Sequence, residues 1–110
     1  MEAPGGDVRR GRLDTDAAPA SGERFSELAR LRNVLIESIV SSASPDGAVY
    51  RQEQDEWVVL LEGSAELDVD GERVSLTAGD WVLLPAGVPH CVLRTSDGAR
   101  WLAVHVHPTS

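Results

Sequence analysis

Two short stretches hold the residues whose types and spacing could do chemistry. YRQEQDEW contains Tyr50, Gln52 and Glu56, and GDWVLLPAGVPH ends on His90. A carboxylate and an imidazole together suit first-row divalent metals, and either can transfer protons. The chain has three histidines and one cysteine. A Cys-rich zinc cluster and an internal disulfide are therefore excluded.

Side-chain parity groups these residues into faces. In an extended segment, residues two apart project to the same side. Tyr50 and Gln52 therefore share a face, and His90 and Arg94 share one in the strand expected to begin at His90. An inward guanidinium at Arg94 would form a bidentate site for a carboxylate or phosphate. The alternatives are an exposed strand arginine or an internal partner of Glu56.

The elements that must position these residues are short strands. From residue 34 onward, β-branched and aliphatic runs are separated by turn signals, as in an all-β sandwich or barrel. We expect extended segments at 34–40, 48–52, 56–63, 64–69, 72–76, 81–84, 90–95 and 100–106. Asp70-Gly71 predicts a tight hairpin. Seven or eight antiparallel strands in about 75 residues cannot hide their edges in a flat sheet, so we expect a small jelly-roll barrel.

The N-terminal part of the chain has a different texture. Residues 1–22 are rich in Gly, Ala, Pro and charge, which predicts a flexible tail ahead of a β-barrel domain over 23–110. Phe25, Leu28 and Leu31 are spaced as on a helix, so we expect a short helical turn leading into the domain.

Charge and hydropathy exclude several classes of function. The net charge of -8 and the pI near 4.7 oppose binding to nucleic acid, which needs clustered Lys and Arg. No apolar run approaches the ~20 residues of a membrane span, and the N-terminus lacks the apolar core of a secretory signal. We therefore expect a cytoplasmic, single-domain protein whose partner is a small molecule, with no nucleic acid and no membrane.

The stretch GDWVLLPAGVPH, residues 79–90, resembles the second signature motif of the cupin superfamily. That motif is glycine, five residues, proline, one residue, glycine, two residues and histidine, and Gly79, Pro85, Gly87 and His90 stand at its spacing. The glycines and prolines force sharp turns and deliver His90 toward the barrel interior. The family motif continues to an asparagine, where this chain has Arg94. The resemblance implies a small, single-domain bacterial cupin.

The first cupin motif is matched only in its second half. Glu56 occupies the glutamate position and the following glycine is in place, but Tyr50 and Gln52 stand where the family has two histidines. The resemblance implies that Gln52, Glu56 and His90 would bind a divalent metal ion, either Fe, Mn, Zn or Ni. Tyr50 and Arg94 would be the catalytic residues, Tyr50 in proton transfer and Arg94 in orienting an anionic group.

Three classes of function stay open. The first is a metal-dependent oxygenase, isomerase or lyase acting on a small organic molecule, with a carboxylate as a candidate group. The second is a metal-free, non-catalytic cupin that binds or senses a small ligand, because an amide and a phenol bind such metals less well than two imidazoles. His90 would then be satisfied by a backbone group, and Glu56 would belong to a solvated acidic patch. The third is a purely structural dimer partner.

Other residues have structural interpretations. His105 could replace a missing imidazole or be a structural histidine. Cys91 faces away from His90 in a strand and is interpreted as a small buried or half-buried thiol. The three tryptophans lie in strand patterns, so we expect most of them in the core or on a dimer face. We expect a homodimer, because cupins often pair through edge strands and an apolar sheet face.

Overall fold

Eight strands build the described part of the molecule. The computed structural model describes residues 8–13 and 17–109. In chain order the strands are β1 (Glu23–Leu31), β2 (Val34–Ser41), β3 (Asp55–Glu62), β4 (Ser64–Val69), β5 (Glu72–Thr77), β6 (Trp81–Leu84), β7 (His90–Thr95) and β8 (Ala99–Val106). All neighbouring strands pair antiparallel, which confirms the all-β expectation.

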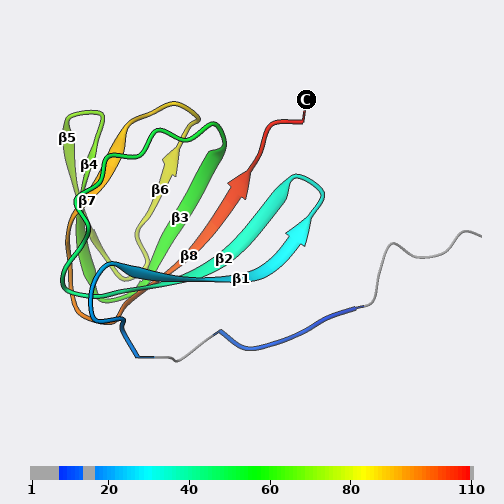
Figure 1. Cartoon of the computed structure of the whole chain (residues 1–110), viewed down its shortest axis with the longest axis horizontal. Coiled ribbons are helices and arrows are strands. Elements are labelled where there is room, and N and C mark those ends of the chain that lie inside the picture. Colours follow the sequence, from blue (N-terminus) through cyan, green and yellow to red (C-terminus); the bar gives the residue numbers. More distant parts are fainter. Residues whose placement is uncertain (1–7, 14–16, 110) are drawn as a thin grey trace, which may run out of the picture.

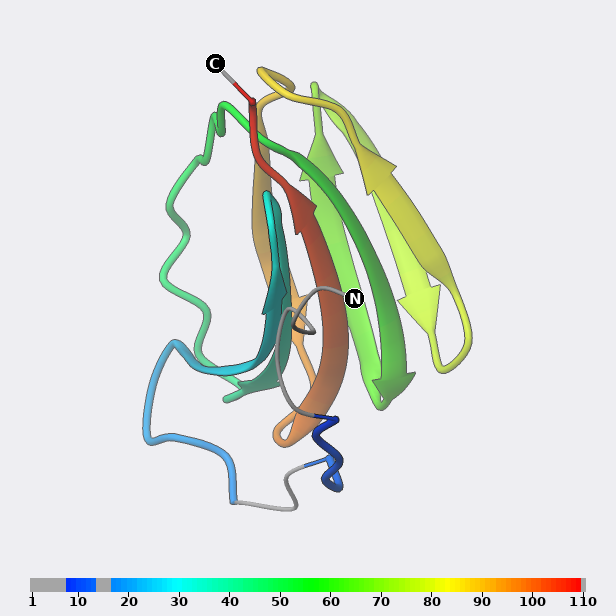
Figure 2. The ribbon, with the colours of Figure 1, turned by 90° about the vertical axis from the view of Figure 1, so that its right-hand side faces the viewer.

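The strands form two sheets. The larger has the order β1-β2-β8-β3-β6 and the smaller has the order β5-β4-β7. In Figure 1 the smaller sheet stands at the left and the larger sheet fans out to the right, ending in the β1–β2 hairpin. Residues 42–54 connect β2 to β3 along one side of the molecule (Figure 2). This arrangement confirms the expected jelly roll.

The expected helical turn near the N-terminus is wrong, because Phe25, Leu28 and Leu31 belong to β1. β1 pairs along its length with β2, and the register shifts between Glu27 and Ala29. This irregularity gives a strand the three-residue apolar spacing that would otherwise indicate a helix. The pairing with β2 lies outside the β1 segment, so the apolar periodicity within β1 could not predict it.

Another difference concerns residues 48–52, which do not form a strand. Only Tyr50 pairs there, in an isolated bridge to His90.

The hairpin between β4 and β5 is confirmed: Asp70 and Gly71 have φ of 53° and 86°. Two successive positive φ angles are what the tightest β-hairpin turn requires. The other expected strands match the observed ones to within one residue at each end.

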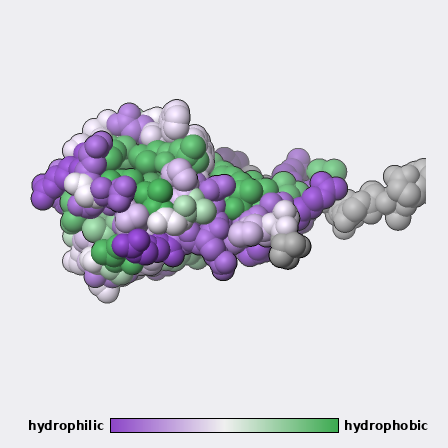
Figure 3. Space-filling model, turned by 90° about the horizontal axis from the view of Figure 1, so that it is seen from above, coloured by the Kyte–Doolittle hydropathy of each residue, from purple (hydrophilic) through white to green (hydrophobic). Residues whose placement is uncertain are grey.

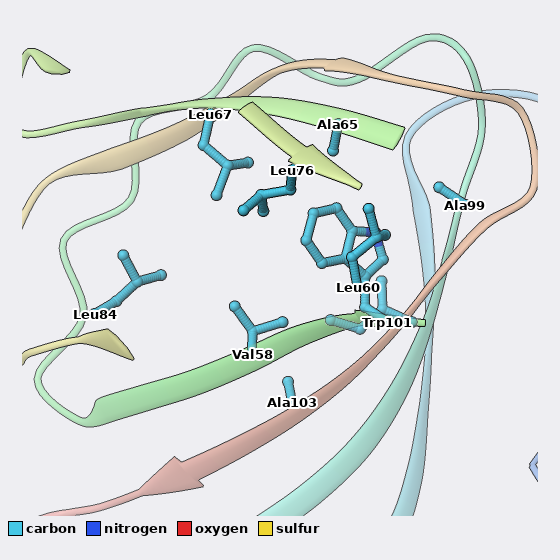
Figure 4. Packing of buried hydrophobic residues seen from close by; sticks show 10 residues of the cluster. Val58, Leu60, Ala65, Leu67, Leu76, Leu84, Ala99, Trp101 and Ala103 are labelled. Atoms are coloured by element: carbon cyan, nitrogen blue, oxygen red, sulfur yellow. The ribbon is translucent and has the colours of Figure 1, made fainter. Parts of the chain in front are cut away.

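The core lies between the two sheets. Val58 and Leu60 on β3 and Trp101 on β8 pack with Leu67 and Leu76 of the smaller sheet (Figure 4). Leu60 is fully buried, with 0% of its surface exposed. Fully burying a leucine stabilises a fold by about 1.5–3 kcal/mol. The inward apolar residues that alternate along β3 and β8 therefore stabilise the larger sheet, which carries much of the site.

The expected tail lies partly outside the described residues, which omit 1–7 and 14–16. At its end, the Gly22 amide donates to the Ser44 carbonyl oxygen at 2.8 Å and the Ser42 amide donates to Gly22 at 3.0 Å. Within the described residues, no helix is long and apolar enough to cross a membrane. The cytoplasmic location stays a prediction.

Candidate functional site

A cavity of about 100 Å³ lies between the sheets, where most of the predicted site residues meet. Its polar lining consists of Glu23, Glu37, Tyr50, Gln52, Glu56 and His90. Its apolar lining comes from both sheets: Figure 4 shows Val58, Leu67 and Leu84 pointing toward a common space. Four of the five predicted site residues therefore line one cavity, and Arg94 does not.

Backbone hydrogen bonds hold the two motifs against each other. The Tyr50 amide donates to the His90 carbonyl at 2.8 Å, and the His90 amide donates back at 3.0 Å. Two residues further on, the Gly87 amide donates to the Gln52 carbonyl at 2.8 Å. Gly87 has a φ of 84°, which favours glycine at this position of the turn. The glycine and prolines of the second motif thus place His90 beside the residues of the first.

The tautomer of His90 follows from its partner. Its Nδ1 lies 3.1 Å from the Val88 carbonyl oxygen. Because a carbonyl oxygen can only accept, Nδ1 carries the proton, and the neutral ring keeps a lone pair on Nε2. The interpretation of His90 as a histidine satisfied by a backbone group holds for one nitrogen, and the other remains for a ligand.

Glu56 is the most buried carboxylate of the site, with 7% of its surface exposed. It follows the first residue of β3 and lies opposite His105 on β8 and Leu84 on β6. Burial raises its pKa, while His105, His90 and a hydrogen bond with Gln52 oppose the rise. The alternative that placed Glu56 in a solvated acidic patch is therefore wrong.

Sequence reasoning missed Glu37, which enters the cavity from β2. The Nε2 atom of His105 donates to Glu37 Oε1 at 2.8 Å, and both side chains are nearly buried. This hydrogen bond raises the pKa of His105. His105 does not line the cavity, so the geometry supports its structural interpretation. The signal for Glu37 was a lone charge inside the apolar run VLIESIV, with inward parity shared with Ile39.

Glu23 was also missed, because the expected helical turn hid its position at the start of β1. Its Oε2 accepts from Ser41 Oγ at 2.6 Å, and that same Oγ accepts the Trp101 indole N–H at 2.9 Å. Burial raises the pKa of Glu23, and the charges of Asp46 and Glu56 raise it further. Glu23 is thus tied to the core on one side and faces another carboxylate on the other.

Tyr50 stands at the mouth of the cavity. Its ring lies against His90 with centroids 5.9 Å apart. Its hydroxyl donates to Asp46 Oδ2 at 2.7 Å, and this hydrogen bond, together with burial, raises the pKa of Tyr50 to about 12. A phenol held neutral in this way is poorly suited to removing a proton from a ligand.

Arg94 lies outside the cavity because β7 is irregular. Glu66 of β4 pairs with Arg94, but the next residue, Leu67, pairs with Val92. Leu93 is therefore an extra residue on β7, and this breaks the parity between His90 and Arg94. Val92 lines the cavity below His90, whereas Arg94 is exposed. The expectation that Arg94 converges with the other site residues is not met.

The donor set of the cavity does not fit a divalent metal centre. Within residues 8–13 and 17–109, no group of three or more His, Cys, Asp or Glu side chains is placed to hold a metal ion. The side-chain oxygen of Gln52, Oε1, accepts from Gln54 Nε2 at 3.1 Å. The Gln52 side chain is also hydrogen-bonded to Glu56. Of the predicted ligand set, His90 Nε2 and the Glu56 carboxylate remain, whereas catalytic metal sites typically have three protein ligands.

Comparison of structures identifies close neighbours of this fold. A protein from Ralstonia eutropha JMP134, provisionally described as a mannose-6-phosphate isomerase, is 35% identical with a TM-score of 0.80, covering 92% of this chain and 100% of that chain. An RmlC-like cupin from Shewanella frigidimarina is 21% identical with a TM-score of 0.72, covering 87% and 86%. The second of these likenesses concerns the fold alone.

Comparison of sequences gives a family match and two relatives that match over part of their length. The cupin domain family matches residues 41–105. An uncharacterised protein from Aquifex aeolicus is 36% identical over 55 residues, which are 50% of this chain and 46% of that protein. Quercetin 2,3-dioxygenase from Bacillus subtilis is 44% identical over 45 residues, which are 41% of this chain and 13% of the enzyme. The matches thus span less than half of each relative.

Proposed function

The chain belongs to the cupin family, and from this premise we propose that it is a metal-free cupin that binds a small organic molecule between its sheets. The observation that carries the proposal is the donor set. Of the predicted ligands, Gln52 is a neutral amide whose side-chain oxygen already accepts from Gln54, and no three described His, Cys, Asp or Glu side chains are placed to hold a metal ion. The proposed activity is binding or sensing, without a Lewis-acid step.

The lining of the cavity supports ligand binding. Ligand sites in proteins combine apolar walls with a few polar groups that fix orientation. Here the walls are aliphatic and aromatic side chains, and the polar groups are already held by the hydrogen bonds of Glu23, Glu37 and His90. Groups fixed before binding lose little conformational entropy when a ligand arrives. The site is therefore preorganised.

The lining of the cavity does not favour a sugar phosphate as the ligand. A sugar phosphate needs positive groups that pair with its phosphate. No Lys or Arg is among the residues that line the described cavity, and Arg94 is exposed outside it. The same reasoning weakens the expectation of a carboxylate ligand.

Metal analysis of the full chain, purified without a histidine tag, tests the proposal. We expect less than about 0.1 equivalent of Fe, Mn, Zn or Ni. We also expect no stabilisation by added metal, whereas a bound ligand at 100 times its Kd would stabilise the fold by about 2.7 kcal/mol. A full equivalent of one metal that is lost in His90→Ala would refute the proposal.

The second candidate is a metal-dependent oxygenase, isomerase or lyase. The observation in its favour is His90, whose Nδ1 donates to a backbone carbonyl at 3.1 Å and leaves Nε2 for another partner. Metal-binding histidines commonly have this arrangement. The same metal analysis separates this candidate from the first.

We also propose that two copies pair through the outer face of the larger sheet. Trp81 and Leu83 on the edge strand β6 are exposed, at 59% and 55%, and Trp81 lies against Trp57 with ring centroids 6.0 Å apart. Leu102 and Val104 continue this face on β8. Hydrophobic residues also form a broad band on the surface seen from above (Figure 3). The five side chains of this patch are Trp57, Trp81, Leu83, Leu102 and Val104. None of them is charged, so no like charges meet within the patch when two copies pair, although the chain has a net charge of -8.

A further inference from the structure

Acidic side chains outnumber basic ones among the described residues that line the cavity. Three carboxylates line it, from Glu23, Glu37 and Glu56, and His90 is the single basic side chain among the described lining residues. Glu37 has a potential cationic partner in His105, whose Nε2 lies 2.8 Å away. The two other carboxylates are hydrogen-bonded to neutral side chains, a serine and a glutamine.

Glu56 is desolvated without full compensation. A carboxylate has about four acceptor positions, and the Glu56 side chain is hydrogen-bonded to the Gln52 side chain. With 7% of its surface exposed, Glu56 has little access to bulk water. Glu23 lies close enough for the two charges to repel each other. A positive ligand would relieve both the repulsion and the missing hydrogen bonds.

The acceptors match one chemical group. Glu23 and Glu56 offer carboxylate oxygens, and His90 offers the Nε2 lone pair. An ammonium group has three N–H donors and no acceptor, so its hydrogen-bonding capacity matches a lining that offers acceptors. A carboxylate or phosphate would meet the same three acceptors with no donor of its own. A neutral hydroxyl has one donor and would satisfy one of them.

The apolar part of the cavity limits the rest of the ligand. Val58, Leu67 and Leu84 face a common space (Figure 4). A volume of about 100 Å³ holds roughly three water molecules at liquid density. The mouth is formed in part by Tyr50 and Phe25, which are both exposed. A short hydrocarbon chain therefore fits, with room to extend toward the mouth.

We propose that the ligand of this cavity is a small organic cation, an ammonium group carried on a short apolar chain. The charged end binds Glu23, Glu56 and His90, and the chain lies against the aliphatic wall. The inference rests on the proposed function, because it names the ligand class of the same site. It also reverses the expectation of a carboxylate-bearing ligand.

Three matched ligands test this inference: n-butylamine, butan-1-ol and butanoate, which share a chain and differ in charge. Binding to the full chain is measured by calorimetry and by chemical-shift titration near neutral pH. We expect butylammonium to bind at least about tenfold more tightly than butanol, and butanoate not to bind. Glu23→Gln and Glu56→Gln should each weaken butylammonium binding about tenfold and leave butanol binding unchanged. Glu72→Gln, which removes one exposed charge on β5, is the matched control.

The outcomes separate the two proposals. Butanoate or butanol binding as tightly as butylammonium would overturn the cation inference and leave the binding function in place. Failure of all three ligands to bind would also overturn the inference, and the metal content would then decide the proposed function independently. An equal loss of butylammonium binding in Glu72→Gln would show that overall charge, rather than the cavity, attracts the cation. If Glu56→Gln fails to fold, Glu23→Gln carries the same comparison.

Discussion

Replacing Glu37 by glutamine should destabilise the fold in a way that depends on pH. The His105 Nε2–H donates to Glu37 Oε1 at 2.8 Å, and the two side chains are 8% and 13% exposed. Glutamine keeps a carbonyl oxygen for this donor, so the variant loses the charge and not the hydrogen bond. Hydrogen bonds to charged groups contribute about 1.5–3 kcal/mol and neutral ones about 1 kcal/mol. We expect Glu37→Gln to lower the free energy of unfolding by about 1–2 kcal/mol at pH 6.

The sign of the pH dependence follows from the raised pKa of His105. A histidine whose pKa is higher in the folded state stabilises the fold fully below its unfolded pKa of about 6.5. That contribution is lost as the pH rises through the folded pKa. Glu56 adds to it, because its carboxylate also favours the protonated imidazole. The difference between wild type and Glu37→Gln should therefore shrink from pH 6 toward alkaline pH.

Urea unfolding between about pH 5.5 and 9 measures this difference. The matched control is Glu27→Gln, which removes an exposed carboxylate from β1 that pairs with Arg30 at 3.1 Å. Exposed pairs of this kind contribute about 0–1 kcal/mol, so the control should show a small effect with no loss above pH 6. A destabilisation by Glu37→Gln that is constant with pH, or that grows above pH 7, would refute the reasoning.

Three further perturbations test the packing and the proposed dimer. Leu60→Ala empties a fully buried position and should cost about 2–5 kcal/mol in urea unfolding; a cost below 1 kcal/mol would contradict the packing described. Gly63→Ala should cost more than Gly98→Ala, since both have positive φ but a Cβ at 63 would lie 2.5 Å from Ser96 Oγ, whereas a Cβ at 98 meets open space. Trp81→Glu should convert a dimer to a monomer in sedimentation at micromolar concentration with the fold intact by circular dichroism; a wild-type monomer would refute the dimer.

Local sequence was sufficient where backbone conformation is set by adjacent residues. Asp70-Gly71 predicts its hairpin because a tight turn requires two positive φ angles, and the structure has them. The same holds for the turn around Gly87, which brings His90 beside Tyr50. These constraints act within a few residues, so a single sequence contains them.

Pairing between strands determined two features that the pattern within a single strand did not predict. Phe25, Leu28 and Leu31 have helical spacing, yet they lie in β1, because β2 pairs with Phe25 and Leu31 and Leu28 is the extra residue at the register shift. Arg94 has the parity of His90, yet one extra residue on β7 turns it away from the cavity. An irregularity in a strand arises from its pairing with a neighbour, and no pattern within six residues reveals it.

The sequence by itself determined the jelly roll, because turn residues and strand alternation act locally, and its resemblance to the cupin motifs predicted the meeting of Tyr50, Gln52, Glu56 and His90. Only the tertiary structure decided the charge of the cavity. Glu23 and Glu37 enter it from β1 and β2, far along the chain from the signature motifs, and Arg94 leaves it. The net charge of a cavity is the sum of the charges on all the elements that face it. That sum is defined only once the two sheets are packed together.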